Sequence, residues 1–173
     1  EVGRRFKMDE YFLPEVMMSA KCMQAALEIL KPLIVAEKTE EIGTVVVGTV
    51  QGDLHDIGKK IVAMMLEAAG FTVVDLGVTV TPDQFMEAIE EHNPVIVGFS
   101  ALLTTTMNMQ WETLKRITAE GKREDLKVFV GGAPISQNWC DKIGADAYAL
   151  DALVAVEKAK ACVTNLANMK GGD

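Results

Sequence analysis

The strongest constraint on the fold of this chain is an alternation of short apolar runs with longer amphipathic segments, which begins at Thr44. The first run, Val45-Val46-Val47, is continuously β-branched, as expected for a parallel strand that is covered on both faces. Strands that alternate with helices join through right-handed crossovers, which place helices on both faces of the sheet. We therefore predict an α/β fold with a flavodoxin-like, doubly wound, five-stranded parallel sheet in the order 2-1-3-4-5.

The same alternation gives approximate bounds for each element. Thr81 followed by Pro82 is typical of a helix start, because threonine caps the first turn and proline needs no N–H there. Gly70 suits the end of the preceding helix. The predicted strands are Val45–Val47, Phe71–Leu76, Val95–Phe99, Val128–Val130 and Ala147–Leu150, and the predicted helices are Ile57–Ala68, Pro82–Glu91, Thr104–Glu120, Ile135–Ile143 and Ala152–Met169.

A separate apolar stripe precedes the alternating segment. From Leu13 to Ile34 the apolar residues recur at helical spacing, which predicts one long helix. Pro14 suits the first turn of this helix, and Pro32 is expected to kink or end it near Lys31. A single helix cannot bury its stripe alone, so we expect it to pack on the following domain, on upstream helices or on another copy of the chain.

A polar stretch over residues 38–43 separates the long helix from the alternating segment and is typical of a linker. We therefore predict a partial helical cap domain over residues 1–38 and an α/β domain over residues 39–173. The chain begins at Glu1 rather than at a methionine, which leaves open what lies upstream.

The composition narrows the classes of partner. A net charge of −8 at pH 7 and a pI near 4.8 argue against binding to nucleic acid or to anionic membranes, since both would repel the chain. No apolar run approaches the roughly 18 residues that span a bilayer. Cys22, Cys140 and Cys162 are scattered without a Cys-x-x-Cys pair, which fits a reducing compartment, and we expect a cytoplasmic protein.

A histidine segment follows the first predicted strand and reads Gly52-Asp53-Leu54-His55-Asp56-Ile57-Gly58. Open α/β sheets bind ligands at the carboxyl ends of their strands, where this segment lies. We predict that His55 binds a metal and that Asp53 accepts the other ring N–H, which fixes tautomer and orientation. Gly58 is expected where the chain turns into the next helix. Taken alone, the same spacing also occurs in ordinary surface turns.

Two further loops should meet the histidine segment, because the predicted order brings the first, third and fourth strands together. They are Ser100–Thr106 after the third strand and Gly131–Pro134 after the fourth. Short hydroxyl side chains and glycines let a bulky ligand lie against the backbone and offer it hydrogen bonds. Each loop also has a simpler interpretation, since the first could cap the next helix and the second could form only a turn.

These three segments resemble the cobalamin-binding domain of corrinoid methyl carriers. The resemblance rests on Gly-Asp-Leu-His-Asp-Ile-Gly-Lys from Gly52, Ser-Ala-Leu from Ser100 and Gly-Gly-Ala from Gly131. The family includes the corrinoid subunits of anaerobic methanol, methylamine and O-demethylating methyltransferase systems and the cobalamin module of methionine synthase. Residues 2–16 are similar to the helical cap that precedes this domain, although the family's cap is a four-helix bundle and only its second half is present here.

The resemblance implies roles toward cobalamin or a related cobamide. His55 would be the lower axial ligand of cobalt, Asp53 would hold its ring N–H, and Thr106 would continue a relay that couples proton movement to the cobalt oxidation state. Ser100 and Thr104 would contact the nucleotide tail. The other implied cofactor-binding residues are Gly52, Leu54, Asp56, Ile57, Gly58 and Leu102 in the first two loops, Gly131, Gly132 and Ala133 beside the tail, and Phe6, Phe12, Leu13 and Val16 on the cap over the reactive face.

By the same resemblance the chain would be a methyl carrier rather than a complete enzyme. Cobalt(I) would accept a methyl group from a methoxyaromatic, methylamine or methanol donor through a substrate-specific methyltransferase. It would pass the group to tetrahydrofolate or a thiol through an acceptor methyltransferase. Self-association of the half-cap would make the carrier a homodimer.

Two other functions stay open at this point. The histidine segment also occurs, by resemblance, in the cobalamin-binding subunit of adenosylcobalamin-dependent mutases, which would not be expected to carry the cap residues Phe6–Val16. A cobalamin-dependent sensor module usually accompanies a basic DNA-reading module, and this acidic chain shows none. Binding of methylcobalamin rather than adenosylcobalamin would separate the carrier from the mutase.

Overall fold

The computed structural model describes residues 5, 8, 10–35, 42–124 and 126–170, apart from some side chains of the first and last long helices. The chain divides into two compact units, Glu1–Ala36 and Glu37–Asp173. One long helix makes up most of the described part of the first unit, and a sheet with helices on both faces forms the second.

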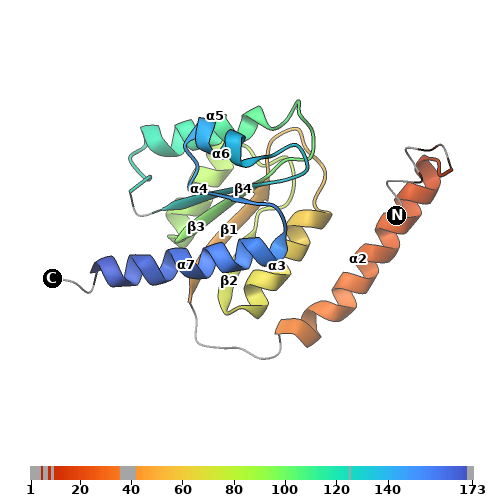
Figure 1. Cartoon of the computed structure of the whole chain (residues 1–173), viewed down its shortest axis with the longest axis horizontal. Helices are drawn as coiled ribbons and strands as arrows, with labels where there is room; N and C mark the ends of the chain where they lie inside the picture. Colours follow the sequence, from red (N-terminus) through yellow and green to blue (C-terminus); the bar gives the residue numbers. More distant parts are fainter. Residues whose placement is uncertain (1–4, 6–7, 9, 36–41, 125, 171–173) are drawn as a thin grey trace. The chain divides into compact units, whose positions relative to one another are not determined.

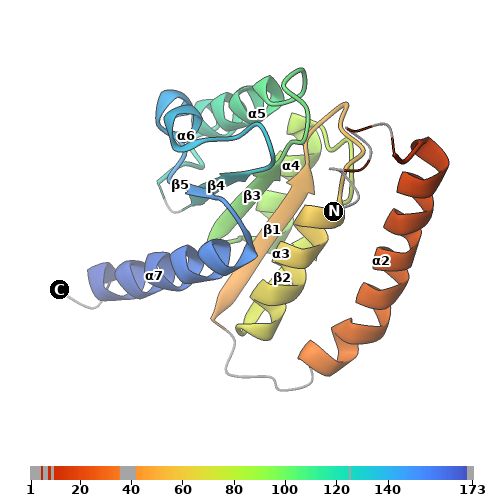
Figure 2. The same ribbon diagram turned by 45° about the vertical axis from the view of Figure 1, so that its right-hand side comes forward.

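The second unit is built on a five-stranded parallel sheet, and its order β2-β1-β3-β4-β5 confirms the predicted topology (Figure 1). Helices α3 and α7 cover one face of the sheet, and α4, α5 and α6 cover the other (Figures 1 and 2). The strands are β1 (Gly43–Thr49), β2 (Phe71–Asp75), β3 (Ile96–Ser100), β4 (Lys127–Gly131) and β5 (Ala147–Ala149). The helices are α3 (Ile57–Ala68), α4 (Pro82–His92), α5 (Asn108–Ala119), α6 (Gln137–Ile143) and α7 (Ala152–Lys170).

Strand β1 supplies side chains to both hydrophobic cores. Val46 packs in the core beneath α4, α5 and α6, whereas Val45 and Val47 pack in the core beneath α3 and α7. All three are buried, with at most 4% of their surface exposed. The continuous apolar run is therefore explained by a strand that is covered on both faces.

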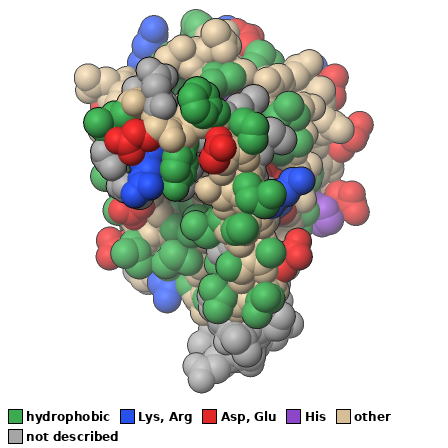
Figure 3. All heavy atoms as spheres, turned by 90° about the vertical axis from the view of Figure 1, so that its right-hand side faces the viewer, with side chains coloured by type: hydrophobic (Ala, Val, Ile, Leu, Met, Phe, Trp, Pro, Cys, Tyr) green, Lys and Arg blue, Asp and Glu red, His purple; other side chains and the backbone are tan. Residues whose placement is uncertain are grey.

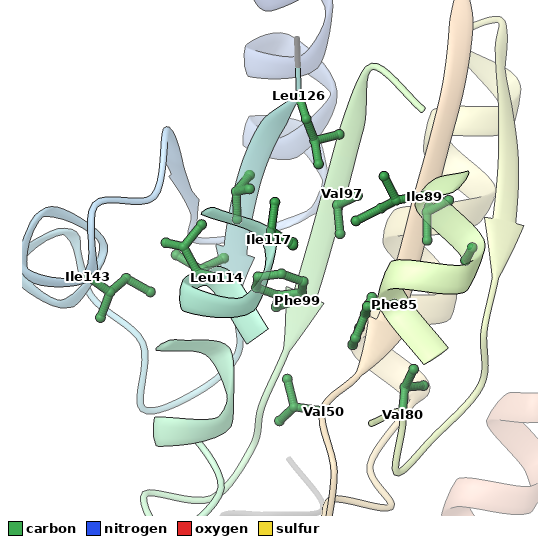
Figure 4. Packing of buried hydrophobic residues seen from close by; sticks show 14 of the residues in the cluster. Val50, Val80, Phe85, Ile89, Val97, Phe99, Leu114, Ile117, Leu126 and Ile143 are labelled. Atoms are coloured by element: carbon green, nitrogen blue, oxygen red, sulfur yellow. The ribbon is translucent and has the colours of Figure 1, made fainter. Parts of the chain in front are cut away.

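The core beneath α4 contains an aromatic pair. The rings of Phe85 on α4 and Phe99 on β3 meet edge to face, with centroids 4.9 Å apart (Figure 4). Phe85 also lies against Gly48 of β1, where an added Cβ would come within 2.6 Å of its ring. The aromatic side chain thus requires a glycine at this position of the strand.

Local capping sets the start of two helices. The side chain of Thr81 accepts the N–H of Gln84, and the side chain of Gln84 accepts the N–H of Thr81, so α4 begins at Pro82 as predicted. Helix α6 begins at Gln137, two residues later than predicted, because the side chain of Ser136 caps it.

The start of α5 is set by distant contacts instead. The sequence predicts a helix from Thr104, but α5 begins at Asn108. The preceding loop is held by Asp53, whose carboxylate accepts the N–H of Leu102 and the hydroxyl of Thr106. These bonds hold Leu102 and Thr106 in a loop that continues through turns, so the regular helix starts at Asn108, about one turn later than the local pattern indicates.

In the first unit, helix α2 extends over Leu13–Val35. Of the two outcomes predicted for Pro32, an end of the helix near Lys31 is wrong, because α2 continues to Val35, whereas a kink at this position stays a prediction. Proline removes one backbone N–H bond and crowds the carbonyl four residues before it. This loss falls in the last turn, where the remaining residues still complete the helix.

Large apolar side chains are exposed along α2. Hydrophobic side chains are visible along this helix in the space-filling view (Figure 3). Helices with apolar residues on several sides are usually covered in the assembled protein. The exposed residues are Met18, Met23, Ile29 and Leu30. Within the described ranges, no helix is both long enough and apolar enough to pass through a bilayer.

Candidate functional site

His55 lies in the loop that follows β1, and Asp53 fixes its ring. Nδ1 of His55 lies 2.8 Å from Oδ1 of Asp53, and the backbone N–H of His55 donates to the same oxygen at 3.0 Å. Because a carboxylate only accepts, Nδ1 carries a proton, so in the neutral imidazole Nε2 is the nitrogen with the free lone pair. The side chain is 52% exposed, and no residue that the structure describes bonds to Nε2. This nitrogen is therefore free to bind a metal.

The carboxylate of Asp53 connects this loop to the loop after β3. Asp53 is fully buried, and its Oδ2 accepts the backbone N–H of Leu102 at 2.8 Å and of Leu103 at 3.3 Å. The hydroxyl of Thr106, also buried, donates to Oδ2 at 2.7 Å. In the predicted relay, the carboxylate of Asp53 thus contacts His55 through one oxygen and Thr106 through the other.

The environment of Asp53 determines its ionisation. Burial raises the pKa of this carboxyl, because a buried charge loses its hydration. Hydrogen bonds from Thr106, from the backbone of His55 and Leu102 and from the His55 ring outweigh burial and hold the pKa well below its usual range. Asp53 is consequently a carboxylate at neutral pH, which keeps the proton of His55 on Nδ1.

The three predicted loops leave adjacent strands at one edge of the sheet. The strand register pairs Thr49 with Ser100 and Ser100 with Gly131, so β1, β3 and β4 end side by side. Because these strands are parallel, the loops that follow them emerge at the same carboxyl edge. The loop after β3 therefore lies between the loop containing His55 and the loop after β4, as the predicted strand order requires.

The first loop presents small and apolar groups to solvent. Gly52 and Leu54 are exposed, and 71% of Leu54 is accessible. Asp56 and Ile57 are half-buried. Asp56 pairs with Lys60 at 2.7 Å and does not cap α3 through its side chain.

Gly58 differs from its prediction. Helix α3 begins at Ile57, so Gly58 lies inside the first helical turn and is not the residue at which the chain turns. Its φ angle is not in the left-handed region. Among the residues that the structure describes, no atom from elsewhere in the chain lies within 4 Å of the place where a Cβ would stand. The glycine therefore leaves open space beside the histidine loop.

In the second loop, Ser100 is half-buried, whereas Leu102 and Thr104 are exposed. In the third loop, Gly131 is half-buried, and Gly132 and Ala133 are exposed. Their roles toward a nucleotide tail stay predictions.

The backbone around Gly132 explains why this position requires a glycine. Its φ angle is 125°, and an added Cβ would lie 1.8 Å from the carbonyl oxygen of Ala101. The loop after β4 therefore packs against the backbone that follows β3, and only glycine permits this approach.

The predicted cap residues belong to the first unit. Phe12 is 65% exposed just before α2. Leu13 and Val16 are in α2, but their side chains, like the whole of Phe6, lie outside the described residues. Their role in covering a cofactor stays a prediction.

The sequence interpretation missed two polar side chains beneath the site. The hydroxyl of Thr49, the last residue of β1, donates to the backbone carbonyl of His55 at 3.0 Å. The amide of Gln110 donates to the carbonyls of Phe99 and Gly131 and accepts the indole N–H of Trp139. A polar residue within an otherwise apolar buried pattern is the signal that could have identified both.

Comparison with known proteins places these residues in a family. The B12 binding domain family matches residues 43–157, and a second B12 binding domain family matches residues 1–31. Trimethylamine corrinoid protein 2 of Methanosarcina mazei is 46% identical over 165 residues, which cover 94% of this chain and 76% of that protein. The chain belongs to the B12-binding corrinoid proteins.

Other relatives of this corrinoid protein agree with that assignment. Dimethylamine corrinoid protein 2 of Methanosarcina acetivorans is 49% identical over 161 residues, covering 92% of this chain and 74% of that one. The structure of the Methanosarcina barkeri monomethylamine corrinoid protein superposes with a TM-score of 0.83 at 40% identity, over 91% of this chain and 74% of that one. A methanol:cobalamin methyltransferase complex, MtaBC from the same organism, gives 0.69 at 32% identity, over 94% and 62%.

The family confirms that the chain is a corrinoid methyl carrier that binds cobalamin or a related cobamide. The residues present fit such a cofactor. A half-exposed imidazole offers Nε2, and the buried carboxylate of Asp53 fixes the other ring nitrogen, as in other metal sites with histidine ligands. His55 would hold the cobalt, and the open space at Gly58 lies in the same segment.

Proposed function

We propose that this corrinoid protein carries methyl groups from a methylamine to a thiol or to tetrahydrofolate, between two methyltransferase partners. The main support is His55, whose ring is fixed through Nδ1 by a buried carboxylate while Nε2 has no partner among the described residues. When bound, the corrinoid supplies the cobalt atom that accepts and releases the methyl group. The protein holds and orients that cofactor.

Each member of the contact chain has a separate part in this proposal. His55 would hold the cobalt through Nε2. Asp53 keeps the proton on Nδ1, which leaves Nε2 as the ring nitrogen that binds. Thr106 donates to the far oxygen of Asp53 and so continues the path for proton movement. Ser100 and Thr104 contact the nucleotide tail.

A methylamine is the preferred donor class in this proposal. The relatives named for trimethylamine and dimethylamine are 46% and 49% identical, whereas the chain in the methanol complex is 32% identical. Neither a thiol nor tetrahydrofolate is favoured as the acceptor by any of these names. Both acceptors therefore belong in the test.

The experiment is a reconstituted transfer. The apo-protein is loaded with cobalamin, reduced, and mixed with trimethylamine, dimethylamine, monomethylamine or methanol, each with a methyltransferase specific for that donor. Parallel reactions contain a thiol or tetrahydrofolate with a methyltransferase specific for that acceptor. We expect demethylation of an amine that is lost in His55→Ala. Transfer from methanol only, or amine demethylation that persists in His55→Ala, would contradict the proposal.

We also propose that residues 1–38 form part of a cap, in which Phe6, Phe12, Leu13 and Val16 cover the reactive face of the cofactor. The exposed apolar side chains of α2 support packing against another surface. A second copy of the chain is one such surface, and sedimentation at several protein concentrations tests for this homodimer. The free cysteines support a cytoplasmic location.

A further inference from the structure

Thr49 interrupts an otherwise apolar buried strand. It follows Val45-Val46-Val47-Gly48 and precedes Val50, and its side chain is fully buried. Valine has nearly the same shape and would fit a buried strand without the cost of burying a hydroxyl. A buried hydroxyl at this place must therefore be satisfied by a specific bond.

The bond that satisfies it leads directly to His55. The hydroxyl of Thr49 donates at 3.0 Å to the backbone carbonyl of His55, six positions further along the chain. Thr49 is itself fixed, since its N–H donates to the carbonyl of Gly77 and its carbonyl accepts the N–H of Val80. The hydrogen bond from Thr49 therefore anchors the backbone of His55 to the end of strand β1.

With this bond, all three polar groups of His55 that face the protein are held. Asp53 accepts the backbone N–H and the ring N–H, and Thr49 donates to the carbonyl. Asp53 restrains the side of the ring that carries Nδ1, whereas Thr49 restrains the backbone from which the ring projects. The direction of Nε2 depends on both.

We propose that Thr49 is a positioning residue for cobalt ligation, which holds the backbone of His55 so that Nε2 is directed before the cofactor binds. This inference rests on the proposed role of His55 as the axial ligand. Without the hydroxyl, the loop keeps the Asp53 contacts but gains freedom at the His55 peptide. Ordering that peptide when cobalamin binds would then cost free energy and weaken binding. A preorganised site avoids this cost.

The test compares Thr49→Val, which removes only the hydroxyl, with Thr49→Ser, which keeps it. Thr49→Ala is a second variant without the hydroxyl. Thr113→Val is the matched control, because Thr113 is also fully buried and donates to a backbone carbonyl, that of Met109, within α5. Folding of each apo-protein is checked by circular dichroism and thermal unfolding.

Two readouts follow addition of cobalamin to these apo-proteins. The first is the dissociation constant. The second is the electron paramagnetic resonance spectrum of the cobalt(II) form in protein whose histidines carry ¹⁵N, where a histidine ligand gives a two-line splitting and the cofactor's own base gives three lines. We expect Thr49→Val and Thr49→Ala to bind about tenfold more weakly and to lose part of the two-line signal. Thr49→Ser and Thr113→Val should match the wild-type protein.

A double variant separates positioning from general stability. If Thr49 acts through His55, adding Thr49→Val to His55→Ala should not weaken cobalamin binding further. Weakening by the same factor in both backgrounds, or wild-type affinity and splitting in Thr49→Val and Thr49→Ala, overturns the inference for Thr49 alone. A two-line signal that persists in His55→Ala instead overturns the ligand role of His55 and, with it, this inference.

Discussion

The Oδ2 atom of Asp53 accepts a hydrogen bond from the hydroxyl of Thr106, 53 residues further along the chain, at 2.7 Å. The other oxygen of the same carboxylate binds His55, so one buried group connects the loops after β1 and β3. The orientation of an exposed histidine is therefore tied to the interior of the fold. Three predictions about the apo-protein follow from this arrangement and from the packing around it, and two more concern the cofactor.

Replacing Asp53 with asparagine should destabilise the apo-protein. An amide offers one acceptor oxygen where the carboxylate uses two, so at least one of the backbone N–H groups of His55, Leu102 and Leu103 loses its partner. An unsatisfied buried donor costs about 1–3 kcal/mol. Urea unfolding of the apo-protein measures this change, with Glu91→Gln as an exposed control expected to stay within about 0.5 kcal/mol. Equal stability of Asp53→Asn and wild-type protein would contradict the account.

The contribution of Asp53 should also depend on pH. Since folding lowers the pKa of this carboxyl, its stabilisation is complete above the unfolded-state pKa of about 3.9 and is lost as the pH falls below that value. The difference in unfolding free energy between wild-type protein and Asp53→Asn should therefore narrow on acidification below about pH 4. Urea unfolding at a series of acidic pH values tests this. A difference that widens on acidification would show that folding raises this pKa instead.

Gly132 and Gly58 should respond oppositely to alanine. Gly132→Ala places a Cβ against the Ala101 carbonyl at a φ angle of 125°, which should cost about 1–3 kcal/mol or more. Gly58→Ala meets no described atom within 4 Å and lies in a helix, so it should leave apo stability unchanged or raise it by up to about 1 kcal/mol.

The Gly58→Ala variant also tests whether Gly58 belongs to the cofactor site. If the open space at Gly58 receives cobalamin, Gly58→Ala should weaken cobalamin binding although the apo-protein is as stable as the wild type. Thermal unfolding and cobalamin titration measure the two properties separately. Unchanged affinity in Gly58→Ala would remove this residue from the site.

The type and approximate bounds of most elements could be predicted because each element carries its own local signal, whereas the strand order was chosen from the doubly wound folds that such an alternation permits. The Val45–Val47 run identifies a strand buried on both faces, and Thr81 with Pro82 identifies a helix start. The positions of Asp53 and His55 at the end of the first strand were likewise sufficient to predict their contact, because the two residues are close in sequence.

Features that depend on distant residues could not be predicted in this way. Helix α5 starts late because Asp53 holds the loop that precedes it. Gly132 is required by the backbone at Ala101, which its own sequence surroundings do not indicate. The partner of Thr49 is a peptide carbonyl, and any residue type supplies such a carbonyl.

The central claim, that Nε2 of His55 binds cobalt, is tested most directly by electron paramagnetic resonance of the cobalt(II) cofactor in protein with ¹⁵N-labelled histidine. The chain has two histidines, so His92→Gln serves as the control. A two-line splitting in wild-type protein and in His92→Gln, absent from His55→Ala, is the predicted result. A three-line splitting in wild-type protein, or a two-line splitting that survives in His55→Ala, would show that this imidazole is not the axial ligand.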